Sequence, residues 1–274
     1  ARPPPAPNPA WPTPAPPRGS VTPRRAVYLP SCVTRMMGPA GSDPLGKDAA
    51  PAYRLVSLAT KAGWEVVTPD GLAGLCCGMM FGSKGFDGAA KKAADRTIAA
   101  LEAASEGGRL PIVCDTSPCT ATLKAALPAG SPLRFAMHEP VGFVSTHLAP
   151  GLDFDKVAGR VAVHVPCSSK KMGATAAFEA LVGRCAAEVV PSGVPCCGMA
   201  GDRGMRYPEL TGGALQHLQS GGCEAGVSTS RTCEMSLSNH SGLHFRSVLD
   251  LVDRAARPRG EAAAGSESDA EAAA

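Results

Sequence analysis

Two short stretches of the sequence carry adjacent cysteines in nearly the same setting. One is GLCCGMMFGSKG, with Cys76 and Cys77, and the other is GVPCCGMAGDRG, with Cys196 and Cys197. Neighbouring cysteines rarely form a disulfide with each other, because the small ring strains the bond geometry. Thiolates are instead soft ligands that bind zinc ions and iron–sulfur clusters. The repeated doublets therefore indicate metal or redox chemistry.

The doublets belong to a longer internal repeat. AVYLPSCVTRMMG matches VAVHVPCSSKKMG, and IVCDTSPCT matches GVSTSRTCE, in the same order around the doublets. Eight of the 11 cysteines thereby fall into two sets of four, which we predict to be metal ligands: Cys32, Cys76, Cys77 and Cys119 in the first copy, and Cys167, Cys196, Cys197 and Cys233 in the second. Cys114 is a candidate for an extra ligand of the first set, at an offset position. Cys185 and Cys223 are expected to be small buried side chains.

One basic residue also repeats in each copy. Lys84 and Arg203 follow the doublets, and each precedes a glycine. A cluster gains negative charge on reduction, so a cation nearby would stabilise its reduced form and raise its potential. Lys84 and Arg203 are therefore predicted to tune the clusters. The alternative, that they are solvated loop charges, stays open.

Strands and helices that alternate along the chain must position these residues. We expect strands at 26–29, 64–67, 110–113, 161–165, 187–190 and 225–228, and helices at 51–62, 87–105, 174–184, 207–218 and 244–256. This order predicts an α/β fold of two similar lobes related by the internal repeat, each a small, mostly parallel sheet with flanking helices. Each cysteine group then follows a strand, at the sheet edge where α/β folds bind ligands.

The two ends differ in composition from the rest of the chain. Residues 1–25 are rich in proline and are expected to form a disordered linker to an upstream segment. Residues 257–274 are of low complexity and turn acidic, so we expect disorder there as well. The first lobe is predicted at 26–150 and the second at 151–256.

Composition limits the classes of partner and compartment. The formal net charge of +3 over 274 residues is too small to indicate a nucleic-acid partner. No apolar run approaches the roughly 20 residues of a transmembrane helix, and the cysteines lie in a chain with ample core rather than in a short disulfide-rich framework. We expect a cytoplasmic protein that can lie at the periphery of a membrane, or a mitochondrial one if the source is eukaryotic.

The motifs LPSCVTRMMG, CDTSPCT, PCSSKKMG, GVPCCGMAGDRGMRYPELT and STSRTCEMSLS resemble two copies of the cysteine-rich CCG domain. That domain occurs in the cysteine-rich subunits of heterodisulfide reductase and of the anaerobic glycerol-3-phosphate dehydrogenase, and in the iron–sulfur subunit of glycolate oxidase. The chain is most similar to the C-terminal region of FAD-linked D-lactate and D-2-hydroxyglutarate dehydrogenases.

The resemblance implies iron–sulfur clusters of the 4Fe-4S type and an oxidoreductase that does not use NAD. It also implies FAD on an upstream flavoprotein module or subunit, and a quinone or cytochrome as electron acceptor. The substrate-oxidising site of relatives lies upstream, so no catalytic residue is predicted in this chain.

Two positions depart from the family pattern. Family copies typically end in Cys-x-x-Cys, whereas Thr116 and Ser230 stand at the first of those positions here. In the heterodisulfide reductase type, the additional cysteine supports non-cubane clusters that cleave disulfides. Four thiolates per lobe suit an ordinary cluster that carries electrons. A thiol–disulfide redox catalyst and a zinc-stapled, non-redox interaction module remain as alternatives.

Overall fold

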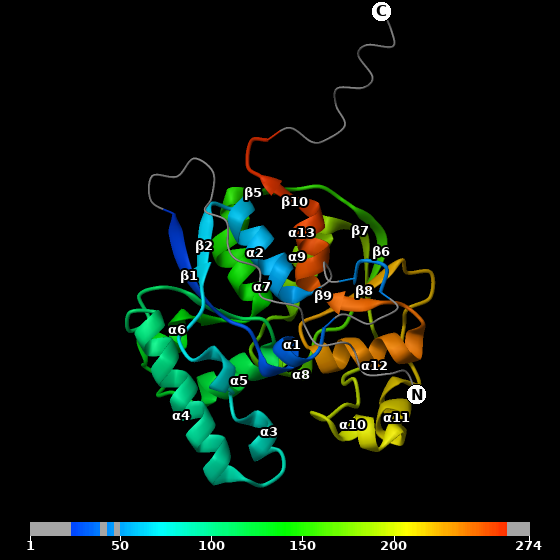
Figure 1. Ribbon diagram of the computed structural model, residues 1–274. Coiled ribbons are helices and arrows are strands. Elements are labelled where there is room, and N and C mark those ends of the chain that lie inside the picture. Colours follow the sequence, from blue (N-terminus) through cyan, green and yellow to red (C-terminus); the bar gives the residue numbers. More distant parts are fainter. Residues whose placement is uncertain (1–22, 39–42, 47–49, 262–274) are drawn as a thin grey trace, which may run out of the picture.

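Two four-stranded sheets form the frame of the fold in the computed structural model, which describes residues 23–38, 43–46 and 50–261 (Figure 1). The first sheet has the order β2-β1-β3-β4, with β1 Arg24–Leu29, β2 Trp64–Val67, β3 Ile112–Cys114 and β4 Met137–His138. The second has the order β7-β6-β8-β9, with β6 Ala158–Val163, β7 Ala186–Pro191, β8 Ala225–Ser228 and β9 Phe245–Ser247. All strand pairs within these two sheets are parallel. The predicted α/β fold of two similar lobes is confirmed.

The central strands are buried on both faces. In β1, Ala26 and Tyr28 point into the core between the sheets, whereas Val27 and Leu29 point into a second core on the outer face. Successive side chains of a strand alternate between the two faces of the sheet, so a strand covered by helices on both sides requires a continuous apolar run. That requirement explains the run AVYL at the centre of the first sheet.

Helices cover the sheets in layers. Between the two sheets lie α2 Pro51–Lys61, α7 Pro140–Phe143, α9 Thr175–Cys185 and α13 Val248–Ala255 (Figure 1). The outer faces carry α4 Asp87–Ala104, α5 Ser117–Ala126, α11 Pro208–Leu215 and α12 Arg231–Ser241. Shorter helices are α1 Cys32–Met36, α3 Met79–Gly82, α6 Pro132–Ala136, α8 Cys167–Lys171 and α10 Arg203–Arg206, with η2 Leu72–Gly74, η3 Val144–Leu148 and η4 Ala149–Gly151 as further helical turns. No described helix is long and apolar enough to cross a membrane.

The central helices give both lobes one common core. Leu55 and Leu58 of α2 belong to the same apolar cluster as Phe178 of α9 and Leu251 of α13, and all four side chains are fully buried. Helix α2 contacts α13, and α7 contacts α9, so each lobe contributes two helices to the shared layer. The two lobes are therefore repeats in sequence but pack as one body.

The structure corrects the element boundaries in three places. The segment 244–256, predicted as one helix, contains β9 and then α13, because the three residues of β9 pair with β8 before the helix begins at Val248. Arg257 and Pro258, predicted to lie in the disordered tail, form part of β10 Ala256–Pro258, which pairs antiparallel with β5 Leu152–Phe154. Arg24 and Arg25, predicted to lie in the linker, belong to β1, where they pair with β2.

These corrections share a cause. Strands as short as β4, β5, β9 and β10 have no periodicity of their own, and only pairing with a distant strand defines them. Residues 1–22 and 262–274, which hold most of the predicted linker and tail, lie outside the described residues.

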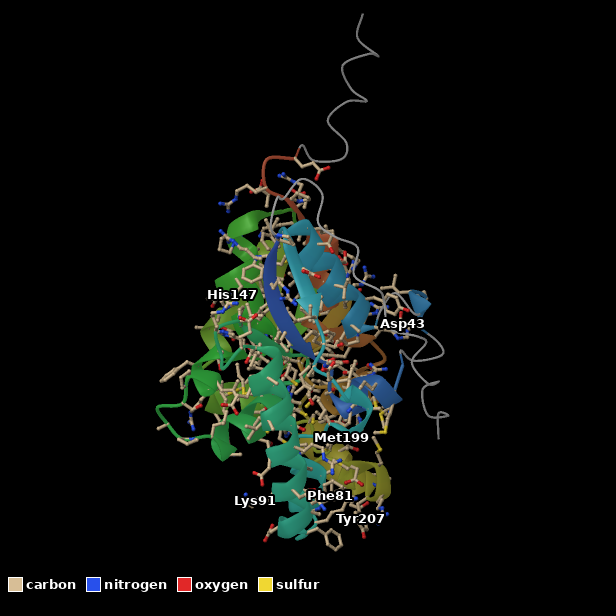
Figure 2. The ribbon with its side chains drawn as sticks, turned by 60° about the vertical axis from the view of Figure 1, so that its left-hand side comes forward. Asp43, Phe81, Lys91, His147, Met199 and Tyr207 are labelled. Carbon is tan, nitrogen blue, oxygen red and sulfur yellow. The ribbon has the colours of Figure 1, made fainter. Side chains whose placement is uncertain are left out.

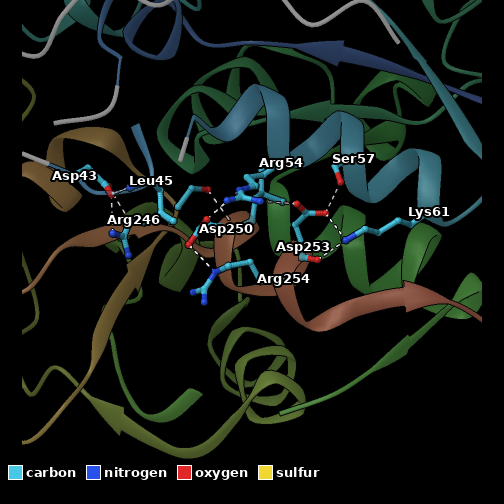
Figure 3. A network of polar contacts seen from close by, with 11 residues as sticks. Asp43, Leu45, Arg54, Ser57, Lys61, Arg246, Asp250, Asp253 and Arg254 are labelled. Carbon is cyan, nitrogen blue, oxygen red and sulfur yellow. Dashed lines mark hydrogen bonds and ion pairs between the residues drawn. The ribbon is translucent and has the colours of Figure 1, made fainter. Parts of the chain in front are cut away.

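A buried ionic network joins α2 to α13 (Figure 3). The Asp253 carboxylate lies 3.0 Å from both Arg54 Nη1 and Lys61 Nζ, and it accepts a hydrogen bond of 2.7 Å from the Ser57 hydroxyl. Asp250 lies 3.0 Å from Arg54 Nε. Both aspartate side chains are at most 4% exposed, and Arg54 is 15% exposed, so the contacts of Arg54 are largely shielded from water and salt, whereas Lys61, which is 30% exposed, is partly open to solvent. The network therefore fixes the register between the two lobes.

We predict that Asp253→Ala destabilises the whole protein by about 1–3 kcal/mol, because it removes the carboxylate that Arg54, Lys61 and Ser57 share. The free energy of unfolding from urea titration measures this. Lys91→Ala is the control, since the Lys91–Asp95 pair on α4 is exposed and its loss should change stability by at most about 1 kcal/mol. Equal effects of the two substitutions would contradict a role for the network in joining the lobes.

Candidate metal centres

Five cysteines meet at the carboxyl edge of the first sheet. Cys32 begins α1 after β1, Cys76 and Cys77 lie in the loop after β2, Cys114 ends β3, and Cys119 lies in α5. All five line one cavity. The parallel sheet explains the convergence, because the ends of β1, β2 and β3 lie side by side and their loops open on the same edge. The four predicted ligands of the first set are together, and Cys114 is beside them.

Two thiols of the first centre are in direct contact. Cys77 Sγ lies 3.1 Å from Cys119 Sγ. The hydrogen bond from Cys32 is the main reason that the pKa of Cys76 is well below that of an ordinary thiol. The pKa values of Cys32 and Cys119 are raised, first by hydrogen bonds with neighbouring cysteines and then by burial, so these thiols must lose their protons when a metal group binds.

The second lobe brings its four predicted ligands together in the same way. Cys167 begins α8, Cys196 and Cys197 lie in the loop after β7, and Cys233 lies in α12. Cys197 Sγ is 3.0 Å from Cys233 Sγ, and the hydrogen bond from Cys233 is the main cause that lowers the pKa of Cys197 to about 7. The pKa of Cys233 is raised, first by its hydrogen bond with Cys197 and then by burial. Charge repulsion from Cys167 makes a smaller contribution in the same direction, so Cys167 lies near Cys233.

The two centres differ in exposure. Cys167 and Cys196 of the second lobe are exposed, whereas Cys32 and Cys76, their counterparts in the first lobe, are only partly exposed. The second cysteine of each doublet is buried in both lobes. The second centre is therefore more open to solvent than the first.

The glycine after each doublet is required by the backbone and by packing. Gly78 and Gly198 have φ values of +85° and +75°, in the left-handed region that favours glycine. A Cβ on Gly78 would lie 2.3 Å from the carbonyl oxygen of Ala90 in α4, and one on Gly198 would lie 2.4 Å from that of Leu210 in α11. Each glycine amide also donates to the sulfur of the first cysteine of its doublet at 3.4 Å. The doublet can thus turn inward only with glycine at this position.

The donor chemistry of the first centre fits a thiophilic metal group. Apart from the five cysteines, the cavity is lined by Leu29, Pro30, Ser31 and Leu75, so none of the described residues in its wall offers a carboxylate or an imidazole. Among the described residues, no three or more His, Cys, Asp or Glu side chains are arranged to hold a single metal ion. Tetrahedral zinc with Zn–S bonds of about 2.3 Å would need sulfurs about 3.8 Å apart. Cys77 Sγ and Cys119 Sγ lie 3.1 Å apart, and Cys197 Sγ and Cys233 Sγ lie 3.0 Å apart, so these thiols would have to spread to hold either a zinc ion or an iron–sulfur cluster.

The two predicted tuning residues cross between the lobes. Lys84 Nζ lies 2.8 Å from Asp202 Oδ2, and Arg203 Nη2 donates to the carbonyl oxygen of Ser83 at 2.6 Å. Phe81 and Tyr207, from the same two segments, lie at one end of the molecule (Figure 2). The sequence alone could not predict these partners, which lie 118 and 120 residues away along the chain. Their effect on a cluster stays a prediction, but both residues join the lobes.

The positions that depart from Cys-x-x-Cys lie at the junction of the lobes. Thr116 Oγ1 and the Ser117 amide both donate to the carbonyl oxygen of Thr229, at 3.3 and 3.0 Å. Ser117 Oγ is 2.8 Å from Ser168 Oγ, directly after Cys167. A cavity crosses this junction, with residues of both lobes in its wall: Cys32, Cys77 and Cys119 from the first, and Ser230, Arg231 and Thr232 from the second. Sequence reasoning missed this junction.

The remaining cysteines behave as expected. Cys185 is fully buried in the core between the sheets, where burial raises its pKa to about 12, and Cys223 is 8% exposed in the outer core of the second lobe. A thiol that stays protonated in an apolar core is a packing side chain. The expectation that both are buried is confirmed.

Fold and site together define a two-lobed α/β protein with a cysteine-rich centre at the carboxyl edge of each sheet. The chain matches the cysteine-rich CCG domain over residues 26–124 and 161–238, and it belongs to that family. The two matched segments contain all eight repeated cysteines and Cys114. No curated protein matches the chain. The family membership supports a cysteine-rich domain that binds metal or a cluster.

We predict that Gly78→Ala is far more destabilising than Gly85→Ala. Both glycines have positive φ, so either alanine should cost about 1–2 kcal/mol in backbone strain. A Cβ at Gly85 meets no atom within 4 Å, whereas one at Gly78 collides with α4, which should add about 1–3 kcal/mol. Urea titration of both variants gives the difference. Equal losses would show that α4 does not constrain the doublet.

Proposed function

We propose that this chain is the iron–sulfur electron-transfer module of an FAD-dependent D-2-hydroxy-acid dehydrogenase, acting on D-lactate or D-2-hydroxyglutarate. In this proposal it takes electrons from a flavin on an upstream module and passes them to a quinone or cytochrome. One observation carries the proposal: the same four-cysteine set recurs at the same edge of two equivalent parallel sheets. Such a set supplies thiolate ligands for a cluster, which exchanges one electron at a time.

The residues of each lobe prepare the site for a charged group. The backbone amides of Gly78 and Gly198 donate to the sulfurs of Cys76 and Cys196 at 3.4 Å, and such hydrogen bonds favour the thiolate. Hydrogen bonds to ligand sulfurs and exclusion of water also set the reduction potential of a bound cluster. Equivalent backbone donors in both lobes therefore support equivalent ligation in both.

The junction supports electron exchange between the two centres. Helix α5, which carries Cys119, contacts α8, which begins with Cys167. Between these helices, Ser117 and Ser168 bond at 2.8 Å. A ligand of one centre and a ligand of the other are thus mounted on helices in direct contact. This arrangement favours two centres in series rather than two independent sites.

A thiol–disulfide redox catalyst is the second candidate. The cavity of the first lobe is lined by five cysteines, and the fifth thiol of Cys114 could take part in disulfide chemistry. The second lobe has Ser228 at the equivalent position, and Thr116 and Ser230 lack the thiols that the reductase type uses. The electron-transfer proposal therefore has the stronger support.

Cluster ligation predicts a specific loss of iron. Cys77→Ser and Cys197→Ser should each remove the iron and acid-labile sulfide of one lobe from anaerobically reconstituted protein, since each removes a ligand from its own set. Cys185→Ser is the matched control, because Cys185 lies in the central core, and it should leave the iron content unchanged. If Cys185→Ser loses as much iron as Cys197→Ser, the ligand sets are wrong. A colourless protein that binds zinc would favour the zinc-stapled alternative.

If the flavin lies on another module, the isolated chain should not oxidise a 2-hydroxy acid. Oxidation of a 2-hydroxy acid transfers a hydride, which requires a flavin or nicotinamide, and the sequence has no G-x-G-x-x-G fingerprint for a dinucleotide. The purified chain with added FAD should not oxidise D-lactate or D-2-hydroxyglutarate in a dye-reduction assay. The same chain fused to a D-2-hydroxy-acid flavoprotein module should pass electrons to the dye, and Cys77→Ser should slow that transfer. Steady turnover by the isolated chain, or a fused enzyme indifferent to Cys77→Ser, would contradict the relay.

A further inference from the structure

Arg35 joins two of the elements that carry the ligands of the first centre. It lies on α1 one turn after Cys32, so the two side chains share a face of that helix. Its Nη1 donates to the carbonyl oxygen of Leu72 at 2.7 Å, and its Nη2 donates to that of Leu75. The Leu75 carbonyl belongs to the peptide bond with Cys76. The guanidinium therefore ties the helix of Cys32 to the loop of the doublet.

The same peptide bond is held from its other side. The Cys76 amide donates to the Thr97 hydroxyl of α4 at 3.0 Å, and that hydroxyl lies 2.8 Å from the Cys76 carbonyl oxygen. Cys32, Leu75 and Cys76 line the cavity of the first centre, whereas Arg35 lies outside its wall. Arg35 is thus a positioning residue, which acts on the ligands through the backbone.

The charge of Arg35 has no countercharge among the described residues. Both of its hydrogen bonds go to neutral carbonyl groups, and its Nε is buried without a partner. Arg54 and Arg246, which are also largely buried, each form an ion pair with an aspartate. A cation away from water is costly unless a negative charge compensates it. Four thiolates outweigh the charge of a divalent metal ion, so the loaded first centre is an anion that supplies this compensation.

The second lobe lacks the equivalent contact. Lys170 stands where Arg35 does in the repeat, and its side chain is exposed. The planar fork of arginine holds two acceptors in fixed directions, whereas the lysine ammonium is a point charge on a flexible stem. Cys167 and Cys196 of the second set are exposed as well. The first centre is therefore the more firmly assembled of the two.

We propose that Arg35 preassembles the first centre and compensates the charge of its thiolates, so that this centre binds metal more tightly than the second. The inference rests on ligation by the cysteine sets, which the proposed function requires. It adds an order to that ligation, because the first centre fills at metal concentrations too low to fill the second.

Cobalt(II) tests this inference without iron, sulfide or flavin, because its visible absorption reports ligation by thiolates. In the full chain, Cys197→Ser leaves only the first set complete, and Cys77→Ser leaves only the second. Anaerobic titration with Co²⁺ should give the lower dissociation constant for the first centre. In the Cys197→Ser background, Arg35→Met should raise that constant about 10- to 100-fold. Arg35→Lys, which keeps the charge, should recover part of the loss.

Arg134→Met is the matched control for the loss of an arginine that bonds to two carbonyl groups. Arg134 Nη1 donates to the carbonyl oxygens of Lys124 and Leu127 at 2.7 and 3.0 Å, at the end of α5 away from Cys119. This variant should leave the cobalt affinity of the first centre unchanged, and Lys170→Met should leave that of the second unchanged. Circular dichroism of each variant reports whether it is folded.

Equal cobalt affinities of Arg35→Met and Arg134→Met would overturn the inference, and so would tighter binding by the second centre than by the first. A failure of Arg35→Lys to recover affinity would overturn the role of the charge. Should Arg35→Met not fold, Arg35→Lys and Arg134→Lys provide the same comparison. Both lose the arginine fork, but only the first loses it beside the ligands, so equal affinities would again contradict the inference.

These outcomes are separable from failure of the proposed function. If neither cysteine set binds cobalt, ligation itself fails, and the proposed function and the inference fail together. If both sets bind cobalt but Arg35→Met behaves as its control does, only the inference about Arg35 fails. If the cobalt results agree with the inference but the reconstituted chain takes up no iron, only the electron-transfer proposal fails.

Discussion

The packing of four helices between two sheets is the interaction that holds every other part of this structure in place. Because α2 and α7 of the first lobe and α9 and α13 of the second bury one common core, the two sheets cannot move independently. The Asp253 contacts with Arg54 and Lys61 fix the same interface with buried charge. As a result, the carboxyl edges of both sheets, and the cysteines mounted on them, keep a constant relation to each other.

Within this common frame, the duplicated lobes differ in small polar details. The ligand positions and the glycine after each doublet are the same in both, because they are set by the strand ends and by the turn that brings the thiols inward. The residues around those ligands are free to differ: Cys114 lines the first centre, whereas Ser228, at the equivalent position of the second lobe, donates its hydroxyl to the carbonyl oxygen of His164. A duplicated scaffold can thus hold two similar sets of thiols in unequal electrostatic surroundings without any change in its backbone.

Lys84 and Arg203, which the sequence predicts to tune the clusters, form contacts between the two lobes. Lys84 follows the first doublet in the sequence, but its charge is paired with Asp202 at 2.8 Å, and pairing weakens the field that it exerts on more distant groups. Arg203 likewise uses a donor on the carbonyl oxygen of Ser83. Sequence position near a metal ligand is therefore weaker evidence for tuning than a direct hydrogen bond to its sulfur.

Local sequence patterns were enough to predict the repeat, the parallel α/β architecture and the two sets of four cysteines. Apolar runs form the buried strands, and cysteines recur at the strand ends, so these features need no knowledge of distant contacts. Two others emerged only from the packed chain: the core that the lobes share, and the contacts of Lys84 and Arg203 across the junction. The inter-lobe partners lie more than a hundred residues apart along the chain, so only tertiary packing brings them together.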